Sequence, residues 1–282
     1  MFLRVVLALS WVGLVAGIFG GIQVQPGELP YNALISIRDT ADRNVIYHSG
    51  SILNDRWILT AAHAVFADRN RLVAFGVTVG KYDMLQADQT EQTRGVKVVI
   101  CHPEYNDAIV GMHDLALLRL LAPVSLNDFV KPVALERSTE YPSVWVGTVS
   151  GYGMVLSSGN SASFLSKLSV NLLSRAVCSS GQDFWNDGLI CTDPGTCGGD
   201  SGAPLVERRG DFWIQIGLVS NGSQCVFYGS PVYYTFVSRY VGWINETIWQ
   251  FEDDNDDDAA IRPSCSVLVV VLVSIWFWVL RS

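Results

Sequence analysis

The sequence lacks a basic cluster. Lysine and arginine number 19, aspartate and glutamate number 27, and the 282 residues carry a formal net charge of −8. Because a nucleic-acid partner requires a basic face that neutralises phosphates, this composition excludes nucleic-acid binding. There is also no internal repeat and no glycine-rich phosphate loop, which excludes repeat architectures and P-loop nucleotide binding.

Long apolar runs are scarce, and the two that stand out lie at the ends of the chain. Residues 5–15 follow Arg4 as one apolar run, and residues 267–280 form another. Neither reaches the ~20 residues that a membrane-spanning helix needs. With Arg4 before it and Val15-Ala16-Gly17 after it, the first run predicts a secretory signal peptide over residues 1–17. An uncleaved signal anchor is the alternative.

The C-terminal stretch has the order of segments found in lipid-attachment signals. An acidic linker and spacer over residues 252–266 includes Asp258-Ala259-Ala260, and the hydrophobic tail 267–282 follows. Small residues, a polar spacer and a terminal apolar tail are typical of a GPI signal. We expect Asp258 to be the lipidated residue, with Asn255 next. A short membrane anchor is the alternative.

The region between these ends has the pattern of an all-β protein. Short runs rich in β-branched and aromatic residues alternate with turn residues, as in antiparallel barrels. The expected strands are 45–52, 57–60, 72–79, 96–100, 116–120, 143–150, 212–219 and 231–236. They divide into rough halves, 18–130 and 131–235. Apolar residues at helical spacing over 237–251 predict a terminal helix.

Three motifs supply a nucleophile, a base and a carboxylate. Ser201 lies in Cys197-Gly198-Gly199-Asp200-Ser201-Gly202, His63 ends Thr60-Ala61-Ala62-His63, and Asp114 precedes an apolar run. A serine hydroxyl is a poor nucleophile until a base takes its proton. In this arrangement Ser201 would attack a carbonyl, His63 would transfer the proton, and Asp114 would orient the imidazole. The N–H groups of Gly199 and Ser201 would form an oxyanion hole.

These motifs resemble the trypsin/chymotrypsin-type serine proteases over about residues 18–251. Further matches are Gly20-Gly21-Ile22, Pro30-Tyr31, Gly50-Ser51-Ile52, His102-Pro103-Glu104-Tyr105-Asn106, Val149-Ser150-Gly151-Tyr152-Gly153 and Val219-Ser220-Asn221-Gly222. The resemblance implies two packed six-stranded antiparallel barrels with a C-terminal helix. It implies a serine endopeptidase with protein or peptide substrates and with protein inhibitors as further partners.

Neither a cofactor nor a metal is expected. The loop that binds calcium in some relatives begins here with Gly80-Lys81, where those relatives place a carboxylate. An ammonium at that position would repel the cation, since calcium requires oxygen ligands.

The resemblance also locates a substrate pocket, formed by Gly195, Ser220, Gly222 and Pro231. Gly195 stands at its floor, where trypsin-like enzymes carry an aspartate. A cationic side chain would be buried there without a partner, so we expect a neutral apolar P1 residue.

One departure lies on the substrate strand, where Asn221 replaces the usual tryptophan. Asn221-Gly222-Ser223 and Asn245-Glu246-Thr247 are both glycosylation sequons. We expect a glycan on Asn245 rather than on Asn221, because a glycan at Asn221 would crowd the cleft.

The activation segment departs from the family as well. Relatives begin with Ile-Val-Gly-Gly after a basic residue, whereas this chain has Gly17 before Ile18-Phe19-Gly20-Gly21. No propeptide separates the signal from Ile18. Signal cleavage after Gly17 would therefore expose the amine that pairs with Asp200, since a buried ammonium needs a partner. Cleavage after Ala16 is the alternative.

Six cysteines in a secreted chain invite pairing that spacing alone cannot assign. The resemblance implies Cys178–Cys191 and Cys197–Cys225. His48 and Ala64 stand where relatives have a disulfide beside the catalytic histidine. Cys101 is then expected to be a buried free thiol rather than part of an intermolecular bridge, and Cys265 lies in the tail.

The sequence thus predicts a secreted, cell-surface-tethered serine endopeptidase. The alternative is a catalytically impaired protease-fold protein that acts as a surface binding or decoy protein. It would be inactive because the strand at Asn221 does not bind substrate or because the N-terminus does not activate the site.

Overall fold

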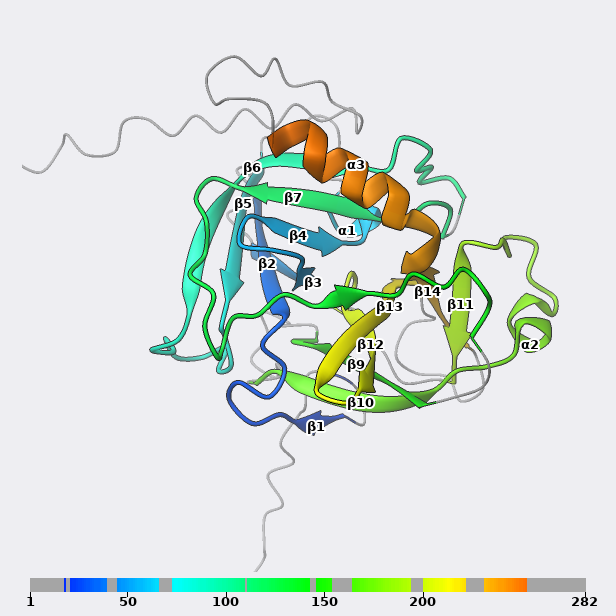
Figure 1. Ribbon diagram of the computed structural model, residues 1–282, viewed down its shortest axis with the longest axis horizontal. Helices are drawn as coiled ribbons and strands as arrows, with labels where there is room; N and C mark the ends of the chain where they lie inside the picture. The colour runs from blue at the N-terminus through cyan, green and yellow to red at the C-terminus, as the bar shows by residue number, and fades with distance from the viewer. Residues whose placement is uncertain are drawn as a thin grey trace, which may run out of the picture.

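Six antiparallel strands of the first half close into a barrel (Figure 1). The computed structural model describes residues 18, 21–39, 45–65, 73–109, 111–142, 146–153, 164–193, 200–221 and 231–252. Around the barrel the order is β2 (Asn32–Asp39), β3 (Val45–Ile52), β4 (Trp57–Thr60), β7 (Ala116–Leu120), β6 (Gln92–Cys101) and β5 (Val73–Val79). Ile35, Ile58 and Leu118 point into this barrel and are fully buried. Ile35 and Ile58 are β-branched residues, which are enriched in strands.

The second half forms a twisted sheet around a separate core. Its order is β1 (Ile22–Gln23), β10 (Ser166–Asn171), β9 (Val146–Gly151), β12 (Pro204–Arg209), β13 (Phe212–Asn221), β14 (Val232–Phe236) and β11 (Leu189–Thr192). β8 (Ala134–Leu135) pairs with β13 in parallel. Val149, Leu205 and Tyr234 lie in the core of this sheet and are fully buried.

The expectation of two closed six-stranded barrels is therefore correct for the first barrel and wrong for the second. Between Leu172, directly after β10, and Thr192 of β11, the structure has one isolated bridge in place of a ladder. Two backbone hydrogen bonds accompany it, from Leu173 N to Cys191 O at 2.9 Å and from Asp193 N to Asn171 O at 3.0 Å. The sheet is curved enough for these segments to touch, but no continuous strand pairing closes it into a barrel among the described residues.

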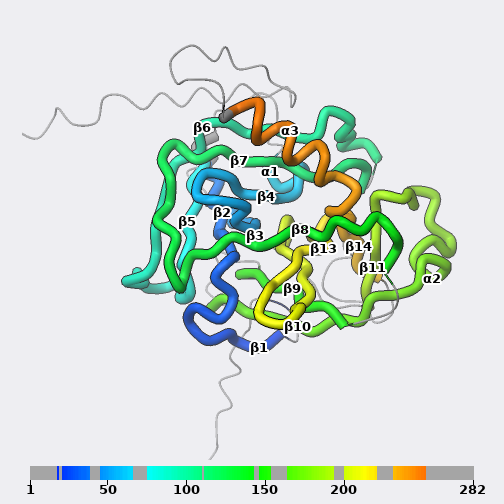
Figure 2. Tube along the Cα trace, viewed as in Figure 1, coloured from blue at the N-terminus to red at the C-terminus, as the bar shows by residue number. Residues whose placement is uncertain are grey.

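Strand β1 belongs to the second sheet rather than to the first barrel. β1 pairs with β10 through Ile22 and Gln23, and Figure 2 shows this blue segment beside the green strand. The division at residue 130 therefore holds for the barrel strands but not for residues 22–23. This crossing brings the N-terminal segment to the half that carries Ser201.

The C-terminal helix fastens the two halves together. η1 (Val237–Tyr240) leads into α3 (Val241–Glu252), which lies across the first barrel in Figure 1. Ile244 is fully buried in a cluster with Trp57 and Leu117 of that barrel, and Phe251 makes an edge contact with Trp57 at 6.0 Å. The predicted terminal helix is thus present, and burial of its apolar face holds it in place.

Every strand expected from the sequence has a counterpart within a few residues. β5, β6, β9, β13 and β14 are shifted or extended at their ends. Two short helices complete the fold, α1 (Ala62–Val65) and α2 (Arg175–Ser179). None of the helices within the described ranges combines the length and hydropathy that a membrane span requires. The predicted signal peptide, the acidic linker beyond Glu252, the tail and Asp258 lie outside these ranges.

Candidate active site

Side chains from the two halves form one hydrogen-bonded chain. Nε2 of His63 lies 2.8 Å from Oγ of Ser201, and Nδ1 of His63 lies 2.7 Å from Oδ2 of Asp114. His63 is on α1 directly after β4, Asp114 lies before β7, and Ser201 precedes β12 of the second sheet. The positions of His63 and Ser201 differ by 138 in the sequence. The fold therefore brings together the three residues predicted as nucleophile, base and carboxylate.

Asp114 is a buried carboxylate with several donors. It is 2% exposed. Its Oδ1 accepts the backbone N–H of His63 at 2.9 Å, and its Oδ2 accepts the hydroxyl of Ser220 at 2.5 Å. Thr235 Oγ1 donates to the backbone carbonyl of Asp114 at 2.8 Å. Since a buried charge is costly without hydrogen bonds, the donors from His63 and Ser220 offset the burial of this carboxylate and fix its orientation.

The backbone around Ser201 packs directly on the first barrel. Ser49 N donates to Ser201 O at 3.0 Å. Gly202 has a φ of 77°, and a Cβ there would collide with the hydroxyl of Thr60 and the carbonyl oxygen of Ser49. Only glycine fits this left-handed, tightly packed position. Gly202 therefore lets the serine loop lie close enough for Ser201 to reach His63.

Comparison with known proteins agrees with this geometry. The trypsin family model matches residues 18–244. The chain belongs to the trypsin family. It is 34% identical over 238 residues to coagulation factor IX of Cavia porcellus, which covers 80% of each chain. It is 35% identical over 238 residues to coagulation factor IX of Oryctolagus cuniculus, covering 80% of this chain and 82% of the relative. It is 31% identical over 262 residues to serine protease 7 of Drosophila melanogaster, covering 82% and 65%.

Membership of the trypsin family makes this chain a serine endopeptidase, a hydrolase that acts on protein or peptide substrates. Of the residues predicted for its pocket and oxyanion hole, Gly195, Gly199 and Gly222 lie outside the described residues. Pro231 is half-buried directly before β14. Ser220 is buried, and its hydroxyl donates to Asp114. This contact is a role for Ser220 that the sequence did not indicate.

The residues predicted as the activation pair are both fully buried in the second half. Ile18 packs in the core cluster that contains Val149 and Ala203. Asp200 accepts the N–H of Gly153 at 3.2 Å, and its carbonyl accepts the N–H of Ala203 at 2.7 Å. Ile18 therefore lies in the core of the half that carries Ser201.

The cysteines follow the family in one pair and differ from expectation at one position. Cys178 and Cys191 form a disulfide with a Cα–Cα distance of 5.7 Å. Cys101 is disulfide-bonded, so the expected free thiol is wrong. The cysteine spacing did not predict this disulfide, and the partner of Cys101 lies outside the described residues. The predicted partners Cys197 and Cys225, and Cys265 of the tail, lie outside the described residues.

The two sequons lie in different surroundings. Asn221 ends β13, where its backbone pairs with Tyr233 of β14. Asn245 is exposed on α3. A glycan on Asn245 would therefore point away from the core.

His48 occupies the place of a cysteine beside the active site. Its Nδ1 is buried without a hydrogen-bond partner in the described part of the chain. Burial, and then its electrostatic interaction with His63, lower the pKa of His48 to about 4. Ala64, at the other lost cysteine position, is buried as well. A neutral imidazole and a methyl group thus fill the place of the family's disulfide.

The loop that begins at Gly80 holds an ammonium group. Lys81 Nζ donates to Gln86 O at 2.6 Å and to Glu91 Oε2 at 2.5 Å, and lies 3.6 Å from Asp88 Oδ2. The carboxylates of this loop therefore surround a cation that the chain itself supplies.

Proposed function

We propose that this trypsin-family protein cleaves peptide bonds outside the cell through Ser201, His63 and Asp114. The hydrogen-bonded chain from Ser201 Oγ through His63 to Asp114 carries this proposal. Ser201 Oγ gives its proton to His63 Nε2 as it attacks the carbonyl carbon of the substrate. Asp114 stabilises the resulting imidazolium, which then protonates the leaving amine. Water reverses these steps on the acyl-enzyme and regenerates Ser201.

Two backbone donors complete the proposed chemistry. The N–H groups of Gly199 and Ser201 bind the oxyanion of the tetrahedral intermediate. Such donors contribute only when they are positioned in advance, and losing one costs on the order of 10²–10³ in rate. The tight packing of Gly202 on Thr60 and Ser49 supports a fixed loop at this point.

A fluorophosphonate probe separates this function from the alternative of an inactive surface or decoy protein. The probe labels only a serine whose hydroxyl is activated by a base. Labelling of the wild-type protein and none of Ser201→Ala is expected. A folded wild-type protein that takes no label would favour the decoy.

We further propose a neutral apolar P1 preference. Gly195 offers no fixed charge at the predicted pocket floor, and burying Arg or Lys there unpaired would be costly. Peptides with Phe, Leu or Met at P1 should have a higher kcat/KM than matched peptides with Arg or Lys. A preference for Arg would refute the pocket assignment.

Activation is proposed to occur at the signal-peptidase step. Cleavage after Gly17 would free the ammonium of Ile18, which would pair with Asp200. The full burial of both residues supports this pairing, because a buried charge needs an opposite charge. Protein that begins at Ile18 should be far more active than protein that retains Gly17. Equal activity would reject the amine mechanism.

Tethering at the cell surface is the last part of the proposal. The order of segments after Glu252 supports a GPI anchor at Asp258. Phosphatidylinositol-specific phospholipase C should then release the protein from cells. Retention after this treatment, with solubilisation by detergent alone, would indicate a membrane-inserted tail instead.

A further inference from the structure

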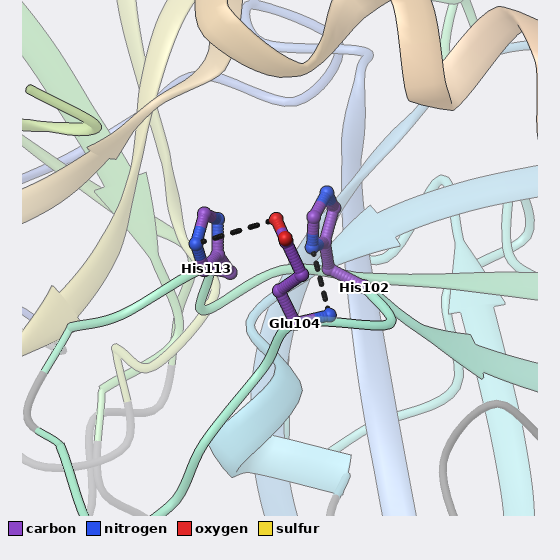
Figure 3. Close-up of side chains that lie close together, drawn as sticks. All are labelled: His102, Glu104 and His113. Atoms are coloured by element: carbon purple, nitrogen blue, oxygen red, sulfur yellow. Dashed lines mark hydrogen bonds and ion pairs between the residues drawn. The ribbon is translucent and has the colours of Figure 1, made fainter.

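The two ends of the catalytic chain are supported by different parts of the protein. On the side of the catalytic carboxylate, the rings of His113 and His102 stack at 4.8 Å, and Nε2 of His113 lies 3.6 Å from Oε2 of Glu104 (Figure 3). His102 also contacts Trp243 of α3 at 5.0 Å. The C-terminal helix thus supports the carboxylate side. The side that carries the nucleophile is supported instead by a loop of the first barrel.

The carboxylate of Asp200, directly before the nucleophile, lies against the backbone of residues 151–153. Gly153 N donates to Oδ1 of Asp200 at 3.2 Å, and a Cβ at Gly151 would come within 2.8 Å of the same oxygen. Asp200 is fully buried. Because a buried carboxylate is costly without donors, the position of this backbone segment determines where Asp200 can lie.

Tyr152 fastens this segment to the first half of the protein. Its side chain is buried, and its hydroxyl donates to the backbone carbonyl of Lys81 at 3.1 Å. The two positions differ by 71 in the sequence. Tyr152 directly precedes Gly153, whose N–H binds Asp200. A displacement of Tyr152 would therefore move a donor of Asp200.

The carbonyl that Tyr152 binds belongs to a loop that is closed on itself, residues 80–91, here called the Lys81 loop. Lys81 Nζ donates to Glu91 Oε2 at 2.5 Å, and the same oxygen accepts the N–H of Asp88 at 3.2 Å. Asp88 Oδ2 in turn accepts the N–H of Tyr82 at 2.8 Å. The side chains of Lys81 and Glu91 are 11% and 26% exposed, so salt screens this pair less than a surface pair. These contacts hold the carbonyl of Lys81 in one place.

The Lys81 loop also holds the segment between Ile18 and β2. Tyr82 O accepts the N–H of Leu165 at 2.9 Å, and Leu165 O accepts the N–H of Val24 at 3.1 Å. Val24 directly follows β1. One loop therefore contacts both the backbone around Asp200 and the segment that leads from Ile18.

We propose that Tyr152 is a positioning residue for the activation pair. Through its bond to the Lys81 loop, it holds the backbone around Asp200 in the form that accepts the ammonium of Ile18. This inference rests on the proposed pairing of Ile18 with Asp200. Because the hydroxyl of Tyr152 acts through Gly153, its loss should loosen the pocket of Asp200 without removing any group that touches substrate.

The reaction of the Ile18 amine with cyanate measures how often this pocket opens. Cyanate modifies an amine only when it is exposed and unprotonated, so the rate is proportional to the population of the locally open form. In protein that runs from Ile18 to Ser282, Tyr152→Phe should raise this rate about fivefold, because a buried hydrogen bond contributes about that factor to an opening equilibrium. Mass spectrometry of the N-terminal peptide follows the modification of Ile18 separately from that of the lysines.

Tyr233→Phe is the matched control. The hydroxyl of Tyr233 donates to Cys178 O at 3.2 Å, and the side chain is buried as well. This variant therefore loses the same kind of bond away from Asp200, and its Ile18 amine should react at the wild-type rate. Lys81→Met should also raise the rate. The factor for the double variant with Tyr152→Phe should be smaller than the product of the two single factors, because both changes act through one bond.

Equal rates in the wild type and Tyr152→Phe would overturn the positioning role, and so would an equal increase in both phenylalanine variants. A double variant whose factor equals the product would overturn the link through the Lys81 loop. An Ile18 amine that reacts in the wild type as fast as in denatured protein would overturn the pocket itself. None of these rates requires peptidase activity. A wild type that hydrolyses no peptide but shows the predicted differences would refute the proposed function and leave the role of Tyr152 standing.

Discussion

Replacing Ser220 with alanine tests how Asp114 is held. The hydroxyl of Ser220 donates to Oδ2 of Asp114 at 2.5 Å, and both residues are buried. A hydrogen bond to a charged group contributes about 1.5–3 kcal/mol, and the carboxylate oxygen would keep only its contact with Nδ1 of His63. The free energy of unfolding should fall by about 2 kcal/mol. If Asp114 then orients the imidazole less well by about 1.4 kcal/mol, kcat/KM falls about tenfold.

Ser238→Ala is the matched control for this change. Ser238 is also buried, and its hydroxyl has no hydrogen-bond partner in the described part of the chain. Removing that hydroxyl should change neither the stability nor kcat/KM appreciably. Denaturant unfolding and peptide hydrolysis would be measured on both variants. If Ser220→Ala and Ser238→Ala behave alike in the two assays, the hydrogen bond from Ser220 does not support Asp114, and the reasoning is wrong.

Three further predictions follow from burial and backbone geometry. His48→Gln should flatten the pH dependence of stability, because burial lowers the pKa of His48 from 6.5 to about 4. As the pH falls from about 6.5 to 4 the unfolded chain takes up this proton first, so the wild type should lose up to about 3 kcal/mol more than the variant over that window. An equal loss in the two proteins would contradict this. Gly202→Ala should lower the free energy of unfolding by about 3 kcal/mol, because the position has a positive φ and the added Cβ collides with Thr60 and Ser49. Gly210 also has a positive φ but open space around it, so Gly210→Ala should lower the free energy of unfolding by only about 1 kcal/mol. Similar losses in the two variants would count against the close packing of the serine loop. Ile244→Ala should destabilise the fold by about 2–5 kcal/mol, because it leaves a cavity between α3 and the first barrel. The control is Trp249→Ala, a change at an exposed residue of α3. If Ile244→Ala costs no more than this control, packing of α3 does not stabilise the barrel.

The sequence predicts the first barrel well because its strands carry local signals. β3, β4 and β7 have the bounds expected from their runs of branched residues. The strands it does not predict are short or mix polar and apolar residues: β1, β2, β8, β10, β11 and β12. β11, for example, has four residues, all buried, and periodicity cannot distinguish a run of that length from a buried helix segment.

The site shows the same limit at the level of single residues. The motifs identify Ser201, His63 and Asp114 because each stands in a distinctive local pattern. The bond from Ser220 to Asp114 joins positions that differ by 106 in the sequence, and nothing local signals it.

The expectation of a second closed barrel failed for a similar reason. Turn residues and alternating runs indicate strands but not how far the end strands pair. Here the residue after β10, Leu172, meets Thr192 of β11 at one isolated bridge. The extent of pairing between these segments depends on the curvature of the whole sheet, which the sequence of either strand does not reveal.

The most direct test of the central claim is the rate of peptide hydrolysis by Ser201→Ala relative to the wild type. Both proteins would begin at Ile18 and act on the same peptide with a neutral apolar P1 residue. Because Ser201 Oγ is the proposed nucleophile, 2.8 Å from its base, kcat should fall on the order of 10⁶-fold in the variant. The fold should be unchanged. A purified variant that hydrolyses the peptide at the wild-type rate would contradict the assignment of Ser201, and with it the mechanism proposed for this protein.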